Sequence, residues 1–483
     1  AVIGAAPDLP GEIRQARTSP CGDRDVETAL CEAAGQSGAE SGPYSDDEGA
    51  TFRHRLPPFA RAVHARSRAL VKSSFTAPCQ SRAMTDMAWL NERRLRDYPR
   101  IFVAVFALAA ALWIGMSDGV VDLKGKPLGY DFITFYSAAQ VARDEPTAVY
   151  DLAAMRAAQL AIAPGTLQPY AWLYPPTFLL LVLPLQWLPY LAALVATMAA
   201  TFVAYQAVLR RIAPHPSTLM LALAFPATFV NFFHGQNGFL NAALLGAGLM
   251  ALERRPVLAG VLLGLLSYKP HLGLLVPVAL IAGRHWRTLV AAGATTLAFA
   301  ALSLAAFGPE AWLAFLDNTP FLRRIVENGN LPWFKMPTVF AAVRLLDGSV
   351  PLAYAVQGAA TLIAASAVWW IWQGTASLPA KSAVLTAAAL AASPYAFDYD
   401  LTVLGLAIAW LAWDGVQRGF RPGEKMVLLA AWLLPAVATP AAEHTGLQIG
   451  PAAVAAVLFC AFRRSNSVSP PSSSVRPPEA TFS

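Results

Sequence analysis

The chain has 483 residues, of which 56% are apolar and only 14% are charged, and its formal net charge is +6. Soluble globular domains carry about 25% charged residues, so this composition excludes an ordinary soluble domain and indicates that most of the chain lies in a lipid bilayer. The positive balance does not indicate a nucleic-acid partner, because the arginines form short clusters between apolar runs, the pattern of cytoplasmic loops in membrane proteins.

The first 83 residues differ in composition from the rest of the chain. They are rich in charged residues, Ser, Gly and Pro and show no apolar periodicity, so they cannot bury enough surface to offset their ordering entropy. We expect residues 1–83 to be disordered or a gene-start artefact, since Met84 begins a typical membrane-protein start without a cleavable signal peptide. Residues 84–464 should form one membrane domain, and the Pro/Ser-rich residues 465–483 a disordered cytoplasmic tail.

A series of apolar runs follows, at residues 101–116, 177–209, 217–233, 238–252, 256–283, 288–307, 351–373, 380–396, 400–414, 425–442 and 446–462. A helical span needs about 20 residues, so the fold class predicted is all-α: a polytopic transmembrane helix bundle of about 10–12 spans. Run 177–209 is too long for one crossing and should hold a partly inserted helix before a true span. Run 256–283 is interrupted by Lys269-Pro270, which predicts a helical hairpin or a broken helix lining a cavity.

Basic residues orient these spans. Lys and Arg gather at ends that would all be cytoplasmic, namely Arg93, Arg94, Arg96, Arg100, Arg210, Arg211, Arg254, Arg255, Arg284, Arg287, Arg418, Arg421, Lys425, Arg463 and Arg464. Both termini would then be cytoplasmic. The opposite, external face would carry a large first loop and every other polar cluster, at residues 117–174, 234–237, 268–271, 308–336, 397–400 and 443–445.

The first external loop contains Gly129-Tyr130-Asp131 near its start and Tyr174 at its end. A loop this long between spans usually has a function. Asp131 lies among aromatic residues near the membrane surface and can act as a general base toward a sugar hydroxyl. The alternative is that Asp131 only caps a helix beginning at Phe132.

Two further clusters interrupt apolar runs. Gln236 and Asn237 form either a tight turn or a pair of amide donors to a sugar or phosphate. Lys269, followed by His271, lies deep in an apolar run, where lysine is costly and usually functional. Its ammonium would suit an anionic head group, whereas the alternative is a lysine that snorkels to the interface.

The last two clusters are charged. Arg323 and Arg324 lie on a predicted external loop, which favours either a phosphate partner or an amphipathic surface helix. Asp398 and Asp400 could bind sugar hydroxyls or a divalent cation. We expect no other metal or cofactor and no disulfide, because Cys21, Cys31, Cys79 and Cys460 have neither metal-ligand spacing nor a partnering His.

The chain contains no GxGxxG, Walker, GxSxG or HExxH motif, which excludes ATP-coupled transport within this chain. Its short motifs instead resemble, in order, those of glycosyltransferase family 87, over about residues 95–415: GYDFITFYSAAQ, AVYD, YPPTFLLLVLPL, HGQNGFLNAALL, LAGVLLGLLSYKPHLGLLVP and ASPYAFDYDL. These polytopic GT-C enzymes resemble mycobacterial polyprenol-phosphate-mannose-dependent α-mannosyltransferases. Many relatives end the Ser-Pro motif with histidines, whereas this chain has Phe397-Asp398-Tyr399-Asp400.

The resemblance implies a hexosyltransferase that moves a sugar, mannose by family default, from a polyprenyl-phosphate donor to a lipid or glycan acceptor. Asp131 would be the catalytic base of an inverting reaction. The protein would lie in a bacterial plasma membrane, with its active site on the external, periplasmic face. Substrate-binding residues would be Tyr130, Tyr174, Gln236, Asn237, Lys269, His271, Arg323, Arg324, Asp398 and Asp400. The alternative function is a transporter or flippase of lipid-linked sugars.

The asymmetry of Lys and Arg yields a topology prediction. Reporter fusions within residues 120–170 and 310–335 should report an external location, and a fusion at the C-terminus should report a cytoplasmic one. A cytoplasmic signal from a fusion near residue 150 would refute both the orientation and the external active site.

Overall fold

The computed structural model describes residues 91–465, and these residues contain helices and no strands. The predicted disordered segment 1–83 with its cysteines Cys21, Cys31 and Cys79, and nearly all of the predicted tail 465–483, lie outside the described residues. Ser465 itself ends the last helix. The N-terminal half of the described region contains helices α3 (Glu92–Gly115), α4 (Phe132–Asp144), α5 (Leu152–Ile162), α6 (Pro176–Val182), α7 (Tyr190–Ile212), α8 (Thr218–Leu223), α9 (Pro226–His234), α10 (Gly238–Ala251), α11 (Pro256–Leu265), α12 (Pro270–Gly273) and α13 (Val276–Ala282).

The C-terminal half contains α14 (Trp286–Glu327), α15 (Val339–Leu345), α16 (Val350–Gln373), α17 (Leu378–Ala392), α18 (Leu404–Arg418), α19 (Glu424–Thr445) and α20 (Gly450–Ser465). Short 3₁₀ helices connect some of these elements, namely η1 (Pro146–Tyr150), η2 (Leu183–Trp187), η3 (Leu266–Tyr268), η4 (Trp333–Lys335) and η5 (Asp398–Thr402).

Six helices among the described residues are long and apolar enough to cross a membrane: α3, α7, α14, α16, η5 continued by α18, and α19. Shorter apolar helices accompany them, including α10, α11, α13 and α17. The all-helical, polytopic architecture predicted from the sequence is therefore confirmed. The number of 10–12 crossings stays a prediction, because within residues 91–465 six helices meet the length expected of a span.

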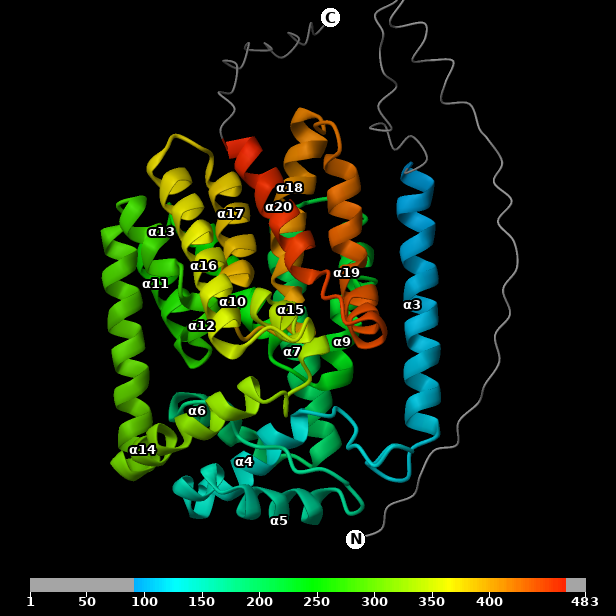
Figure 1. The fold of residues 1–483 in the computed structure, drawn as a ribbon, viewed down its shortest axis with the longest axis vertical. Helices are drawn as coiled ribbons and strands as arrows, with labels where there is room; N and C mark the ends of the chain where they lie inside the picture. Colours follow the sequence, from blue (N-terminus) through cyan, green and yellow to red (C-terminus); the bar gives the residue numbers. More distant parts are fainter. Residues whose placement is uncertain (1–90, 466–483) are drawn as a thin grey trace, which may run out of the picture. The chain divides into compact units, whose positions relative to one another are not determined.

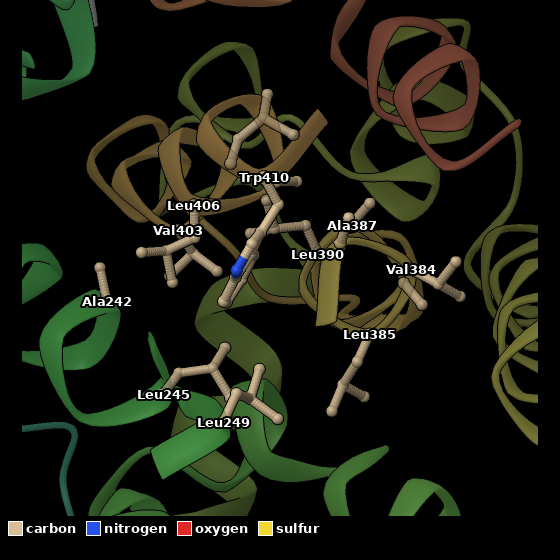
Figure 2. Close-up of a cluster of buried hydrophobic side chains, with 14 of the residues drawn as sticks. Ala242, Leu245, Leu249, Val384, Leu385, Ala387, Leu390, Val403, Leu406 and Trp410 are labelled. Carbon is tan, nitrogen blue, oxygen red and sulfur yellow. The ribbon is translucent and has the colours of Figure 1, made fainter. Parts of the chain in front are cut away.

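Short buried helices form the core of the bundle. After its first turn, from residue 382 to 392, nearly every side chain of α17 is buried. This part of the helix therefore contacts protein on all sides, which explains why it has no polar face. Trp410 of α18 projects between α10 and α17, on the same helical face as Val403 and Leu406 (Figure 2). Its neighbours in the cluster are Ala242, Leu245, Leu249, Val384, Leu385, Ala387 and Leu390.

Prolines divide the long apolar runs. Run 177–209 separates into a short helical piece, α6 with η2, and the long helix α7, as predicted. Run 256–283 is broken at Lys269-Pro270 into α11, η3, α12 and α13, which confirms the predicted broken helix. Run 217–233 also divides, because Pro226 begins the new helix α9.

The segment 308–336 differs from the predicted loop. Helix α14 continues past Phe307 to Glu327, with a change of direction at Gly308, whose φ of 78° and ψ of 166° are not helical. In Figure 1 the part of α14 after this kink turns back beneath the bundle, next to α6. This geometry agrees with the surface-helix alternative for Arg323 and Arg324.

The two ends of the bundle differ in composition. Figure 1 shows the start of α3, the α18–α19 connection and the end of α20 at one end, and α4 and α5 at the other. The arginine clusters at residues 93–100, 418–421 and 463–464 belong to the first end. The first predicted external loop, residues 117–174, contains α4, η1 and α5 and belongs to the second end.

A buried ionic cluster joins the last three helices. Arg464 of α20 donates to Asp414 of α18 and to Glu424 of α19, and it also donates to the carbonyl oxygen of Gly419 at 3.0 Å. The side chains of Arg464 and Glu424 are only 5% and 2% exposed. Each charge therefore depends on the other for compensation.

We predict that Arg464→Met destabilises the protein by about 3–5 kcal/mol, because it leaves the Glu424 carboxylate buried without its partner. The midpoint of thermal unfolding in detergent should fall clearly. The matched control is Arg463→Met, which changes the neighbouring exposed arginine and should leave the midpoint nearly unchanged. If the two substitutions lowered the midpoint equally, the ionic cluster would not contribute specifically to stability.

Candidate active site

A cavity of about 1110 Å3 lies where the polar clusters predicted from the sequence converge. Its wall comes from the loop before α4, the segment before α6, the α9–α10 turn, the η3–α12 break, the second half of α14, η4 and the segment before η5. The predicted site residues on this wall are Tyr130, Asp131, Tyr174, Gln236, Lys269, His271 and Arg323.

The loop before α4 presents Asp131 to this cavity. Gly129 and Tyr130 both have positive φ angles, of 78° and 30°, and the helix begins at Phe132 as predicted. The backbone N–H of Asp131 donates to the carbonyl oxygen of His234 at 3.0 Å. Its carboxylate makes no capping bond to α4. Instead Oδ2 accepts a hydrogen bond from Nε2 of Gln236 at 3.1 Å, so the capping alternative does not describe this side chain.

The α9–α10 turn is held against that loop by a glycine. Gly235 ends α9 in the left-handed conformation with φ of 58°, where a Cβ atom is disfavoured. A Cβ at this position would also lie 2.8 Å from the carbonyl oxygen of Gly129 and 2.6 Å from Cβ of Phe132. The close approach places Gln236 within reach of Asp131.

Hydrogen bonds continue from the turn into the bundle. Nδ2 of Asn237 donates to the Tyr174 hydroxyl at 3.1 Å, and that hydroxyl donates to Oε1 of Gln236 at 3.4 Å. Nζ of Lys269 donates to Oδ1 of Asn237 at 3.0 Å and forms an ion pair with Oδ1 of Asp400 at 2.6 Å. The side chains of Lys269 and Asp400 are 4% and 0% exposed, so the structure brings these predicted residues together as one buried network.

Asp398 and His271 lie next to this network. Oδ1 of Asp398 accepts from the backbone N–H of Tyr399 at 2.9 Å, and Oδ2 accepts from the Thr439 hydroxyl at 3.2 Å. The His271 ring packs edge-on against Tyr395, and its buried Nε2 has no hydrogen-bond partner among the described residues. Among residues 91–465, no group of three or more His, Cys, Asp or Glu side chains is placed to hold a metal ion.

Positive charge gathers on the wall near Asp131. Nζ of Lys335 lies 3.2 Å from Nε2 of His234, and Nζ of Lys126 lies 5.2 Å from the centroid of the Tyr130 ring. Burial lowers the pKa of Lys126, and the positive charge of Lys335 lowers it further. Neither lysine has an ion-pair partner within the described part of the chain, so an anion in the cavity would relieve their mutual repulsion.

The two arginines predicted to bind substrate differ from each other. Arg323 lines the cavity, although its side chain is 71% exposed and pairs with Glu327 at 2.7 Å. Arg324 is exposed and is not among the cavity residues, so the structure does not bring it to the site.

Two residues of the site were missed by the sequence analysis. Lys126 lies in the same loop as Asp131, and its short distance from Asp131 in the sequence could have identified it as a site residue. Asn241 donates to Oδ1 of Asn237 at 3.1 Å. A spacing of four residues places Asn237 and Asn241 on one helical face, so that pattern could have identified Asn241.

The described residues therefore form a polytopic helical membrane protein. Its polar, partly cationic cavity is the candidate active site. Residues 172–394 match the model of glycosyltransferase family 87. This match confirms the predicted resemblance to that family, which implies a membrane glycosyltransferase. Searches of curated proteins and of solved structures gave no match. Tyr130, Asp131, Asp398 and Asp400 lie outside the matched residues.

We predict that Gly235→Ala lowers the thermal midpoint and disturbs the site, because the methyl group would collide with the loop before α4. Gly119→Ala is the matched control, since Gly119 has the same φ of 58° but no neighbouring atom within 4 Å of the added Cβ. Gly119→Ala should lower the free energy of unfolding only by the cost of a left-handed alanine, about 1–2 kcal/mol. If both variants unfold at the same temperature, the close contact at Gly235 does not constrain the turn.

Proposed function

We propose that the protein transfers a hexose, mannose by family default, from a polyprenyl-phosphate donor to a lipid or glycan acceptor, with inversion at the anomeric carbon. The observation that carries this proposal is the position of Asp131. Its carboxylate faces a large cavity, is not used to cap its own helix, and is oriented by the amide N–H of Gln236. Such a group can receive the proton of an acceptor hydroxyl.

The proposed reaction is a single displacement. A carboxylate oxygen of Asp131 removes the proton from the acceptor hydroxyl as its oxygen forms a bond to the anomeric carbon. The bond between that carbon and the phosphate oxygen breaks on the opposite face, and its electron pair leaves with the polyprenyl phosphate. Negative charge therefore moves from the acceptor side to the leaving phosphate, where cationic side chains lower the barrier.

Lys126 and Lys335 support this assignment, because both line the cavity without an ion-pair partner among residues 91–465. Arg323 also lies on the wall, and the sequence analysis assigned it to the phosphate. Tyr130 and Tyr174, also on the wall, present aromatic surfaces on which sugar rings can stack.

The proposal includes no cofactor. Asp398 and Asp400 were the candidate ligands for a divalent cation, but their carboxylate oxygens accept hydrogen bonds from Thr439, Lys269 and nearby backbone N–H groups. A metal would have to displace these donors.

We place the reaction on the external face of a bacterial plasma membrane. The basis is the separation of the arginine clusters from the α4–α5 end of the bundle. A transporter or flippase would also bind a lipid-linked sugar, but it would form no new glycosidic bond, so product formation by purified protein separates the two functions.

We predict that Asp131→Asn lowers turnover by about two to four orders of magnitude, because an amide of the same size cannot accept the proton. Donor affinity should change little, since the phosphate is assigned to other side chains. The measurement uses purified protein in nanodiscs with a labelled polyprenyl-phosphate sugar, scored for a glycosidic product and for donor binding.

The control is Asp144→Asn, which alters an exposed carboxylate of α4 that pairs with Arg143 and should retain normal turnover. Near-normal turnover by Asp131→Asn would end the assignment of Asp131 as the base.

A further inference from the structure

The buried ion pair of Lys269 and Asp400 is connected to Asp131 by consecutive hydrogen bonds. From the ion pair they run through Asn237, the Tyr174 hydroxyl and Gln236 to the carboxylate, with distances of 3.0, 3.1, 3.4 and 3.1 Å. These residues come from five separate segments of the chain.

The direction of each hydrogen bond follows from the lysine. An ammonium group can only donate, so the atom of Asn237 that faces Lys269 must be the oxygen, and the Asn237 amide nitrogen must face the Tyr174 hydroxyl. That hydroxyl then accepts from Asn237 and has its own proton available for Oε1 of Gln236. The nitrogen of Gln236 is consequently the atom that faces Asp131.

Neighbouring donors enforce the same direction. Nδ2 of Asn241 also donates to Oδ1 of Asn237, at 3.1 Å, and Tyr268 donates to Oδ1 of Asn241. The backbone N–H of Asn237 donates to Oε1 of Gln236 at 3.2 Å. Each amide oxygen in the chain therefore meets two donors, and reversing either amide would place donor against donor.

The ammonium group of Lys269 is already occupied by partners within the protein. Its ammonium contacts Asp400, Asn237 and the face of the Tyr399 ring, whose centroid is 4.9 Å away. Asp400 in turn accepts from the backbone N–H of Phe397 through its second oxygen at 3.1 Å. A phosphate bound directly to Lys269 would have to compete with a buried carboxylate at 2.6 Å.

We infer that Lys269 and Asp400 are positioning residues, which fix the direction of this hydrogen-bonded chain so that Gln236 presents its N–H group to Asp131. The inference rests on the proposed function, because it takes Asp131 as the base. It gives Lys269 a role different from the phosphate contact expected from the sequence.

The test separates the two roles. Lys269→Met combined with Asp400→Asn removes both charges together, which keeps the local net charge and avoids a buried unpaired ion. With the ammonium gone, Gln236 is less firmly held, and a carboxylate that loses an N–H donor retains its proton to higher pH. We expect the acidic limb of the pH–kcat profile to move upward by about 1, so that kcat at a given pH on that limb falls about tenfold, with the donor Kd within about twofold of wild type.

A second variant, Tyr174→Phe, breaks the same chain without changing any charge and keeps the aromatic ring. It should move the acidic limb in the same direction, and combining it with the double variant should add little further. The matched control is Tyr150→Phe, because the Tyr150 hydroxyl donates to the backbone oxygen of Tyr174 at 3.0 Å and lies outside the chain. This control should leave the profile unchanged.

Other charged or titratable groups surround Asp131, and Tyr174→Phe alters none of them. The charged or titratable groups around it are Asp122, Lys126 and Tyr130 on its own loop, Tyr170, Tyr190, His234, Lys335, Tyr395, Asp398 and Tyr399. The uncharged variant is therefore the decisive one.

A donor Kd weakened tenfold or more with an unmoved pH profile would assign Lys269 to the phosphate and overturn the inference. An unmoved profile in Tyr174→Phe would overturn it as well, even if the double variant failed to fold. In both cases the wild-type enzyme still forms product through Asp131. Failure of the proposed function is distinct, since it appears as normal turnover by Asp131→Asn or as no glycosidic product from wild type.

Discussion

The ion pair between Lys269 and Asp400 is the interaction on which the geometry of the site depends. Two charges enclosed by an apolar helix bundle are stable only when they compensate each other. Lys269 lies at the break between η3 and α12, and Asp400 lies in η5, the irregular turn that precedes α18. The pair therefore requires two interrupted helices to meet at one place, and these interruptions supply part of the cavity wall.

Close backbone packing brings the third partner to this pair. A Cβ atom on Gly238 would lie 2.5 Å from the carbonyl oxygen of Tyr399 and 2.6 Å from Oδ1 of Asn231, so only glycine allows α10 to begin against η5. Asn237, the preceding residue, is thereby held beside the ion pair. The polar network is thus a consequence of how closely the turn between α9 and α10 approaches the segment that carries Asp400.

Local features of the sequence predicted much of the fold. Prolines and a buried lysine marked the break at Lys269-Pro270, and a run too long for one span predicted the division before α7. The continuation of α14 through Gly308-Pro309 was not predicted, because a glycine followed by proline normally ends a helix. Here the glycine absorbs the change of direction with a positive φ, and proline occupies the first turn of the continuing helix, where its missing N–H is tolerated.

The site was predictable as a set of residues but not as a set of contacts. The sequence analysis selected polar residues in or next to apolar segments, because such residues are costly and usually functional. These residues were Asp131, Gln236, Asn237, Lys269 and Asp400. The pairing of Lys269 with Asp400 spans 131 residues, and no local pattern encodes a contact at that separation. For the same reason Arg324 could not be distinguished from its neighbour Arg323, since the two differ only in which side of the helix reaches the cavity.

The arrangement also explains how a family-matched core and its flanking segments share one site. Residues 172–394 contain Gln236 and Lys269, whereas Asp131 precedes this region and Asp400 follows it. Each flanking carboxylate is held by a donor from the matched region, Asp131 by Gln236 and Asp400 by Lys269. Because Asn237 and Tyr174 link these two donors, the position of one carboxylate is coupled to that of the other through side chains of the core. Changes in the segment 397–400 can therefore alter the environment of Asp131 without contact between the two segments.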